Sequence, residues 1–168
     1  MSLRWKNDYM GRNFGFKYKQ LEFNDNRFHA IYFVDSVTGA LLLSNRYSDN
    51  SSGISKNYDD LIGSFLNAIN MFIREIKSNK DEEIQEINFK KTRIIYEKRG
   101  RLICIAISKK TNLQIERQII HEIMKDFYHR FEHEINEFKG FIEPKILDYK
   151  TRLKYLNLNS LVSFNKNI

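Results

Sequence analysis

Three short segments of the chain are apolar at every position, and this feature constrains the fold more than any other. They read AIYFV, ALLL and LICIAI, at residues 30–34, 40–43 and 102–107. Successive side chains of a strand point to opposite faces of a sheet, so these segments have no polar face to turn toward water. We therefore expect a sheet that is covered on both faces, in a three-layer α/β/α domain.

The first two of these segments predict a β-hairpin. Residues 28–34 and 40–46 are strand-like, and the intervening DSVTG has Asp35 and Ser36 to start a turn and Gly39 for a left-handed position. A polar loop is expected at 47–58. A helix follows over 59–77, because its apolar residues recur at intervals of three and four. These residues are Leu61, Ile62, Phe65, Leu66, Ile69, Phe72, Ile73 and Ile76.

The second half predicts three strands and two helices. The strands, at 82–90, 92–98 and 102–108, have no helix-length segment between them, which indicates an antiparallel meander with RGR as a tight turn. The first of them alternates and carries charge, as an edge strand does. A long helix should begin at Thr111, where Thr111 and Gln114 fit a capping box, and end near Lys139 before Gly140. A last helix should run from Glu143-Pro144 to about Leu156.

The resulting order, β-β-α-β-β-β-α-α, resembles that of a longin domain. That α/β (α+β) fold is a five-stranded antiparallel sheet with the first helix on one face and the last two on the other. The resemblance covers about residues 28–156. Its most specific parts are the hairpin with its helix and RIIYEKRGRLICIAIS, which are similar to prokaryotic longin-like and roadblock-like regulators. Residues 1–27 form an N-terminal extension that could hold a short extra strand, and 157–168 form a tail.

The resemblance implies a non-enzymatic role without cofactors. Longin domains commonly bind small GTPases, partner longin domains or intramolecular peptides. We therefore expect a protein-interaction module that binds or regulates a small Ras-like GTPase or a trafficking-type complex. The resemblance also raises the expectation of dimerisation, either with a second copy or with another longin or roadblock-domain protein.

The segment HRFEH at 129–133 raises an enzymatic alternative. It fits H-x-x-E-H, in which two histidines bind zinc and a glutamate is the general base. On a helix with about 100° per residue, His129 and His133 share a face roughly opposite the apolar stripe, and Glu132 also lies off the stripe. A catalytic zinc also needs a third protein ligand and an enclosed cavity. A solvated helix face is the preferred interpretation, and a metal-dependent hydrolase using His129, Glu132 and His133 stays as the less favoured alternative.

No other residues of the sequence form a recognisable catalytic, cofactor-binding or metal site. His29 and His121 are isolated from any nucleophile that the sequence can place beside them. Cys104 lies in the most apolar strand, where a thiol is normally an inert core residue. A single cysteine, no signal-peptide pattern and no run of about 20 apolar residues favour a cytoplasmic protein.

The basic residues give the candidate partner-binding surface, with a solvated rim of the sheet as the preferred interpretation. The net charge of +7 favours nucleic acid, anionic lipid or an acidic protein as a partner. In an antiparallel meander, the strand ends place Lys90 and Lys91 at the same end of the sheet as Lys109 and Lys110. The opposite end carries Lys98, Arg99 and Arg101. A basic-surface binder of nucleic acid or of an anionic membrane is therefore the main alternative function. Nucleic acid has weak support, because no known nucleic-acid-binding signature accompanies the charge.

Overall fold

The computed structural model describes residues 27–47, 64–65, 68–69, 71–72, 75 and 83–155. The predicted N-terminal extension (except residue 27) with its extra strand, the polar loop from residue 48 onward and the tail at 157–168 lie outside these ranges. Within the described part of the chain, no helix is long and apolar enough to cross a membrane.

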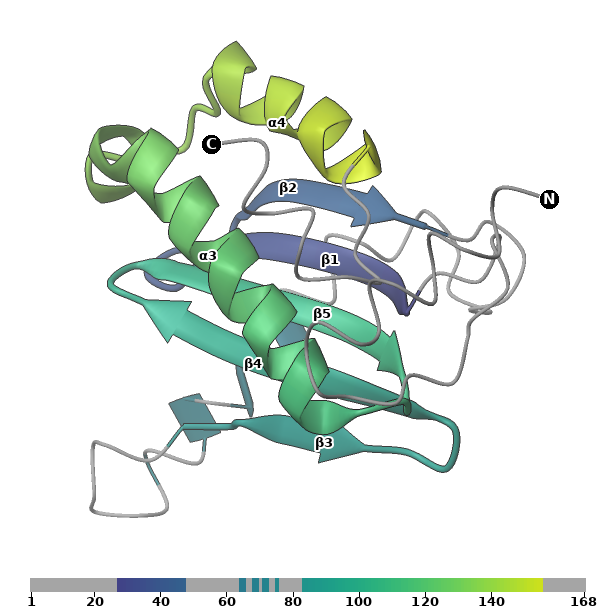
Figure 1. Cartoon of the computed structure of the whole chain (residues 1–168). Coiled ribbons are helices and arrows are strands. Elements are labelled where there is room, and N and C mark those ends of the chain that lie inside the picture. The colour runs from purple at the N-terminus through teal and green to yellow at the C-terminus, as the bar shows by residue number, and fades with distance from the viewer. Residues whose placement is uncertain are drawn as a thin grey trace, which may run out of the picture.

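Five strands form one antiparallel sheet in the order β2-β1-β5-β4-β3 (Figure 1). The predicted hairpin is β1 (Phe28–Asp35) with β2 (Leu41–Arg46), and Gly39 has the expected positive φ of 74°. The predicted meander is β3 (Glu86–Asn88), β4 (Thr92–Arg99) and β5 (Leu102–Lys109). β3 has three residues where the alternation predicted nine. The chain turns toward β4 directly after Asn88, and before Glu86 the contact with β4 continues with the hydrogen bond from the Tyr96 N–H to the Gln85 carbonyl.

β1 and β5 are buried on both faces, as their composition predicts, whereas β2 is only partly buried on one face, where Leu41 is half-buried. In β1, Ile31 and Phe33 belong to one core cluster, whereas Tyr32 and Val34 belong to the cluster on the other face. β5 alternates in the same way, and its first seven residues are buried. A β-bulge between Phe28 and Ala30 shifts the register with β5. Because of this shift, Phe28 lies on the same face of the sheet as Ile31, although simple alternation would place the two on opposite faces.

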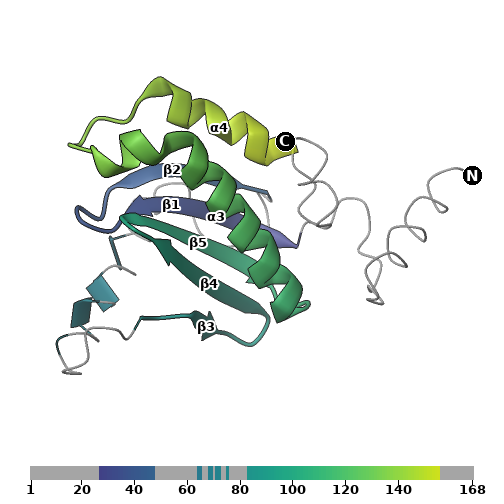
Figure 2. The same ribbon diagram turned by 60° about the vertical axis from the view of Figure 1, so that its left-hand side comes forward.

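Two helices cover the first of these faces, which we call the helix-pair face (Figures 1 and 2). α3 (Leu113–Asn136) lies over β4 and β5, and α4 (Pro144–Tyr155) lies over β2. The described residues between 64 and 75 are helical, and Ile69 among them packs against the cluster of the opposite face. One helical segment on one face and two helices on the other is the longin arrangement. The predicted fold class is confirmed, and the fold is longin-like.

The apolar stripe of the first helix is wider than the part that packs on the sheet. Ile69 is half-buried, whereas Phe65 and Phe72 are 62% and 64% exposed. At 100° per residue, Phe65 and Phe72 lie roughly 40° and 60° to the same side of Ile69. The described aromatic residues of this stripe therefore lie on a flank of the helix beside the residue that packs on the sheet, and they are open to solvent.

The ends of α3 differ from the prediction. The N-cap is Asn112, whose Oδ1 accepts from the backbone N–H of Ile115, and the predicted box of Thr111 with Gln114 does not form. Thr111 instead donates its backbone N–H and its hydroxyl to Glu116. The helix also ends at Asn136, three residues earlier than expected. The Glu137 N–H still donates to the His133 carbonyl four residues back, but the Phe138 N–H donates to the Ile135 carbonyl three residues back, so the α-helical pattern stops.

Asp126 of α3 holds α4 in place. Its Oδ2 accepts from the Tyr149 hydroxyl at 2.6 Å and from Arg152 Nε at 2.9 Å, while Oδ1 accepts from Arg130 Nε at 3.0 Å. Tyr149 also packs edge-on against Phe127. Burial by itself would raise the pKa of Asp126, but these three hydrogen bonds hold it below the ordinary 3.8. The carboxylate therefore stays charged at the junction of the two helices.

Candidate interaction surfaces

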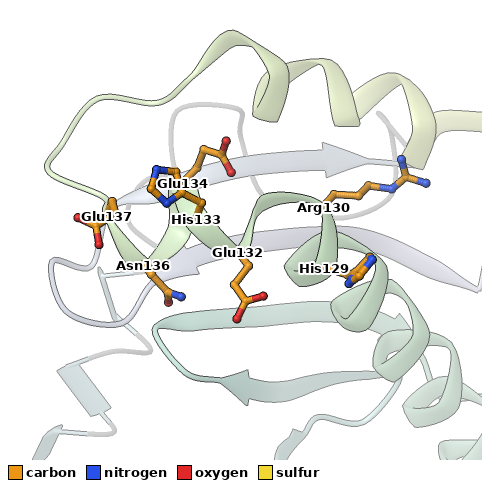
Figure 3. A pocket seen from close by; sticks show the side chains of 7 residues that line it. All are labelled: His129, Arg130, Glu132, His133, Glu134, Asn136 and Glu137. Carbon is orange, nitrogen blue, oxygen red and sulfur yellow. The ribbon is translucent and has the colours of Figure 1, made fainter.

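The HRFEH residues lie on the solvent side of α3, as the helical pattern predicts. His129, Glu132 and His133 are all exposed, and they border an open depression along the C-terminal part of the helix. The regular i, i+4 spacing of the two histidines is interrupted by Phe131, which lies between them and has non-helical backbone angles (φ −126°, ψ 24°). Figure 3 shows the two imidazole rings lying apart, with Glu132 pointing away from both. No group of three ligands suited to a metal ion occurs among the described residues.

One end of the sheet gathers the four lysines that the meander predicts there. Thr92 pairs with Lys109, and the backbone N–H of Lys110 donates to the carbonyl of Lys91 at 3.3 Å. Lys90, Lys91 and Lys110 are exposed, and Lys109 is half-buried. Burial lowers the pKa of Lys109 from its ordinary value. α3 begins at Leu113, so the positive end of its dipole lies at this same end of the sheet.

At the opposite end, the three basic residues make contacts within the fold. Lys98 Nζ lies 3.0 Å from Glu83 Oε1, and the Arg99 guanidinium lies over the ring of Tyr128, 4.9 Å from its centroid. Both contacts leave the side chains accessible at the β4–β5 turn. Arg101 is engaged more deeply.

Arg101 and Asp35 form a buried ion pair, called the latch below, that joins three elements. Nε and Nη2 of Arg101 donate to the two carboxylate oxygens of Asp35 at 2.8 and 3.0 Å, and Asp35 is fully buried. The same guanidinium donates to the carbonyls of Asn136 and Phe138 at the C-terminal end of α3. Burial would raise the pKa of Asp35, but hydrogen bonds from Arg101 and Thr38 hold it below its ordinary 3.8. Arg101 thus connects the β1–β2 turn, the β4–β5 turn and α3.

A second buried ion pair lies at the other end of α3. Glu116 is fully buried; its Oε2 accepts from Arg93 Nη1 at 2.7 Å, and its Oε1 accepts from Thr111. This pair ties the first turn of α3 to β4. Sequence reasoning did not find it, because Glu116 reads as an ordinary acidic residue in a first helical turn.

Cys104, His29 and His121 differ in their burial. Cys104 is fully buried in the core of the helix-pair face, and burial raises the pKa of its thiol well above the ordinary value. His29 is almost fully buried in β1, and burial lowers its pKa. His121 is exposed, and its Nδ1 lies 2.8 Å from Glu97 Oε1.

Comparison with known proteins gives distant structural likenesses. No protein-family model and no curated protein sequence matches the chain. The chain is similar to MglB of Myxococcus xanthus, with 18% identity and a TM-score of 0.49 over 63% of this chain and 85% of that one. It is also similar to a chain in a homology model of the full-length AP-3 complex in a stretched open conformation. That match has 12% identity and a TM-score of 0.46, and it covers 83% of this chain and 88% of the other. Likenesses this distant do not indicate a shared function.

Exposed apolar side chains are the surface feature that sequence reasoning missed. Phe65, Met71 and Phe72 are each more than 60% exposed on the helical segment, and Phe89 is 52% exposed in the β3–β4 turn. Periodicity assigns Phe65 and Phe72 to a buried stripe, and alternation places Phe89 on one face of a strand. The position of Phe89 directly before two lysines was the available signal that it lies in an exposed turn.

Proposed function

We propose that the chain is a non-enzymatic protein-interaction module that binds or regulates a small Ras-like GTPase or a trafficking-type complex. The observation that supports the proposal most is the longin-like arrangement of one helical segment and two helices on a five-stranded antiparallel sheet. Domains of that kind act by surface recognition, and the proposal assigns the same mode to this chain.

The proposed contact with the protein partner is the outward face of the first helical segment. Phe65 and Phe72 are seven residues apart, so on a helix they lie about 20° from each other on the same side. Two large aromatic side chains exposed by 62% and 64% supply the apolar centre that protein interfaces use, because burying them in a partner removes their apolar surface from water. Lys98 and Arg99 are proposed as accessory polar contacts; Arg101 would have to leave Asp35 to reach a partner.

Binding to Ras-like GTPases from the same genome tests this proposal. The purified chain is mixed with each GTPase, loaded with GDP or with a non-hydrolysable GTP analogue, and examined by size-exclusion chromatography and by nucleotide-release kinetics. We expect a complex, or a changed release rate, with at least one GTPase. The double variant Phe65→Ser/Phe72→Ser should lose this effect, because it removes the apolar contact without disturbing the buried core.

Phe141→Ser is the matched control, since Phe141 is 74% exposed and lies in the loop between α3 and α4. It should bind like the unmodified chain. The absence of any complex and of any change in nucleotide release across the set would contradict the proposal, as would full binding by the double variant.

A further inference from the structure

An exposed basic tip forms where β3 turns into β4 and where β5 ends. We define the basic tip as Phe89, Lys90, Lys91, Lys109 and Lys110. The turn is closed by the Phe89 backbone N–H, which donates to the Thr92 carbonyl at 2.9 Å. The bond from Lys110 to the Lys91 carbonyl joins this turn to the end of β5. Both views in Figures 1 and 2 show the β3–β4 turn, the end of β5 and the start of α3 together at one end of the sheet.

Three lysines of the basic tip carry positive charge that no described residue neutralises. Lys90, Lys91 and Lys110 are exposed and form no ion pair with any residue in the described ranges. The nearby carboxylates are already engaged, since Glu86 lies 2.8 Å from Arg117, and Glu116 is buried against Arg93. The first turn of α3 adds the partial positive charge of a helix N-terminus. This end of the domain therefore presents a positive potential to an approaching surface.

Phe89 distinguishes the basic tip from an ordinary solvated rim. A phenylalanine that is 52% exposed directly before two exposed lysines leaves a large apolar ring in water beside the charge. At a bilayer surface, anionic headgroups lie next to the outer boundary of the hydrocarbon layer. An aromatic ring can therefore contact hydrocarbon while the neighbouring lysines contact headgroups. An acidic protein would need an apolar pocket placed beside its carboxylates to receive the ring, and a nucleic acid would need an unstacked base, whereas any anionic bilayer offers charge and hydrocarbon together.

We propose that the basic tip is a docking site for an anionic membrane surface. Phe89 inserts at the boundary between headgroups and acyl chains, while the lysines contact lipid phosphate and carboxylate groups. This surface is separate from the outward face of the first helical segment, so the inference goes beyond the proposed function and does not depend on it. Its charge and its one aromatic ring suit reversible, peripheral binding, because stable anchoring takes more than one such signal.

Vesicle co-sedimentation with the full chain tests the proposal. The probes are vesicles of phosphatidylcholine alone and of phosphatidylcholine with about one third phosphatidylserine, at low and at physiological salt, since surface charge attraction is screened by salt. We expect binding to the anionic vesicles, weaker binding as salt is raised, and no binding to the neutral ones. Equal binding to both kinds of vesicle, or to neither, would overturn the proposal.

Charge variants identify the surface. In Lys90→Gln/Lys91→Gln/Lys110→Gln, the partition coefficient on anionic vesicles should fall by roughly 100-fold, because each basic residue near such a membrane contributes about fivefold. All three positions are exposed, so the fold should be unchanged by circular dichroism.

The matched control removes the same charge elsewhere. Lys125, Lys150 and Lys154 are exposed on α3 and α4, and the triple variant with Gln at these positions should keep most of its vesicle binding. A loss of equal size in this control would show that only net charge matters, and would overturn the assignment to the basic tip.

Substitutions of Phe89 separate a membrane from other polyanions. Phe89→Ser should weaken binding to anionic vesicles several-fold, whereas Phe89→Trp should retain or strengthen it, because tryptophan favours the membrane interface. Binding to a single-stranded oligonucleotide is measured in parallel. Nucleic-acid binding that exceeds vesicle binding, or vesicle binding that is indifferent to residue 89, would overturn the proposal in favour of general polyanion attraction.

Discussion

At the scale of single residues, the fold depends on a few buried charges that have no role in chemistry. Asp35 and Glu116 are both fully buried, and each is held by an arginine that reaches it from another element. Removing the partner of a buried charge destabilises a protein far more than removing an exposed ion pair, because the remaining charge has neither water nor a counter-ion.

Substituting Arg101 by Met should destabilise the domain by about 2–4 kcal/mol, since the Asp35 carboxylate would stay buried without its two guanidinium hydrogen bonds. Urea unfolding followed by circular dichroism measures this. Arg99→Met is the control; it removes one exposed contact over Tyr128 and should cost less than about 1 kcal/mol. Similar costs for the two variants would contradict a stabilising role for the latch.

The two aspartates with lowered pKa values give the stability a defined dependence on acid. Because the pKa of Asp126 is lower in the folded state, its contribution is fully present above the ordinary 3.8 and is lost as the pH falls below that value toward the folded-state pKa. The free energy of unfolding should therefore decrease as the pH falls from about 4 through about 3. Asp126→Asn should flatten this decrease, and Asp148→Asn, at an exposed position of α4, should leave it as it was. Urea titrations across this range provide the measurement, and equal slopes in the two variants would argue against the assignment.

At the scale of elements, α4 is held to the rest of the domain by one buried face. Ile146, Tyr149 and Leu153 are buried on that face, and the Tyr47 hydroxyl donates to the Leu153 carbonyl at 3.3 Å. Helices this short depend on packing rather than on their own propensity, so the docking of α4 is sensitive to those three side chains.

Leu153→Ala should destabilise the domain by about 2–5 kcal/mol, because it deletes a fully buried side chain and leaves a cavity. Leu147→Ala, at a position that is 49% exposed on the same helix, should change stability by no more than about 0.5 kcal/mol. Thermal unfolding compares the two. A small effect of Leu153→Ala would mean that α4 does not pack as described.

At the scale of the whole molecule, the sheet is the middle of three layers. The alternating residues of β5 show this most directly, since Cys104 and Ala106 face the helix pair and Ile103 and Ile105 face the opposite side, all with at most 1% exposure. Along β5, apolar surface is therefore removed from water on both sides of the sheet.

Truncating one isoleucine on each face tests the three-layer arrangement. Ile31→Ala on the helix-pair face and Ile105→Ala on the opposite face should each cost about 2–5 kcal/mol. Val37→Ala, in the exposed β1–β2 turn, should cost almost nothing. Chemical denaturation of the three variants decides the matter: an Ile105→Ala as mild as Val37→Ala would show that the opposite face is bare.

The fold was predictable because its pattern is carried by short stretches of sequence. Apolar runs in β1, β2 and β5 specify two covered faces, and the turns at DSVTG and RGR specify antiparallel neighbours. The start of α3 was less predictable, because Thr111 and Asn112 are both residue types that cap helices. In the structure Thr111 donates to the Glu116 side chain, and Asn112 accepts from the Ile115 N–H as the cap.

The surface was predictable only in part. Lys90, Lys91, Lys109 and Lys110 come together as the meander requires, since strand ends follow from strand order. The engagement of Arg101 could not be read from the sequence, because its partner Asp35 is 66 residues away and is brought close only by the pairing of β1 with β5.

The two buried ion pairs, one near each end of α3, also restrict how this domain can move. Glu116 joins the start of the helix to β4. Arg101 joins the end of the helix to the β1–β2 and β4–β5 turns at the opposite end of the sheet. α3 therefore cannot shift along the sheet without breaking one of these charged contacts. We therefore expect any rearrangement on binding of the proposed partner to occur in the other layer, where Phe65 and Phe72 of the first helical segment are exposed.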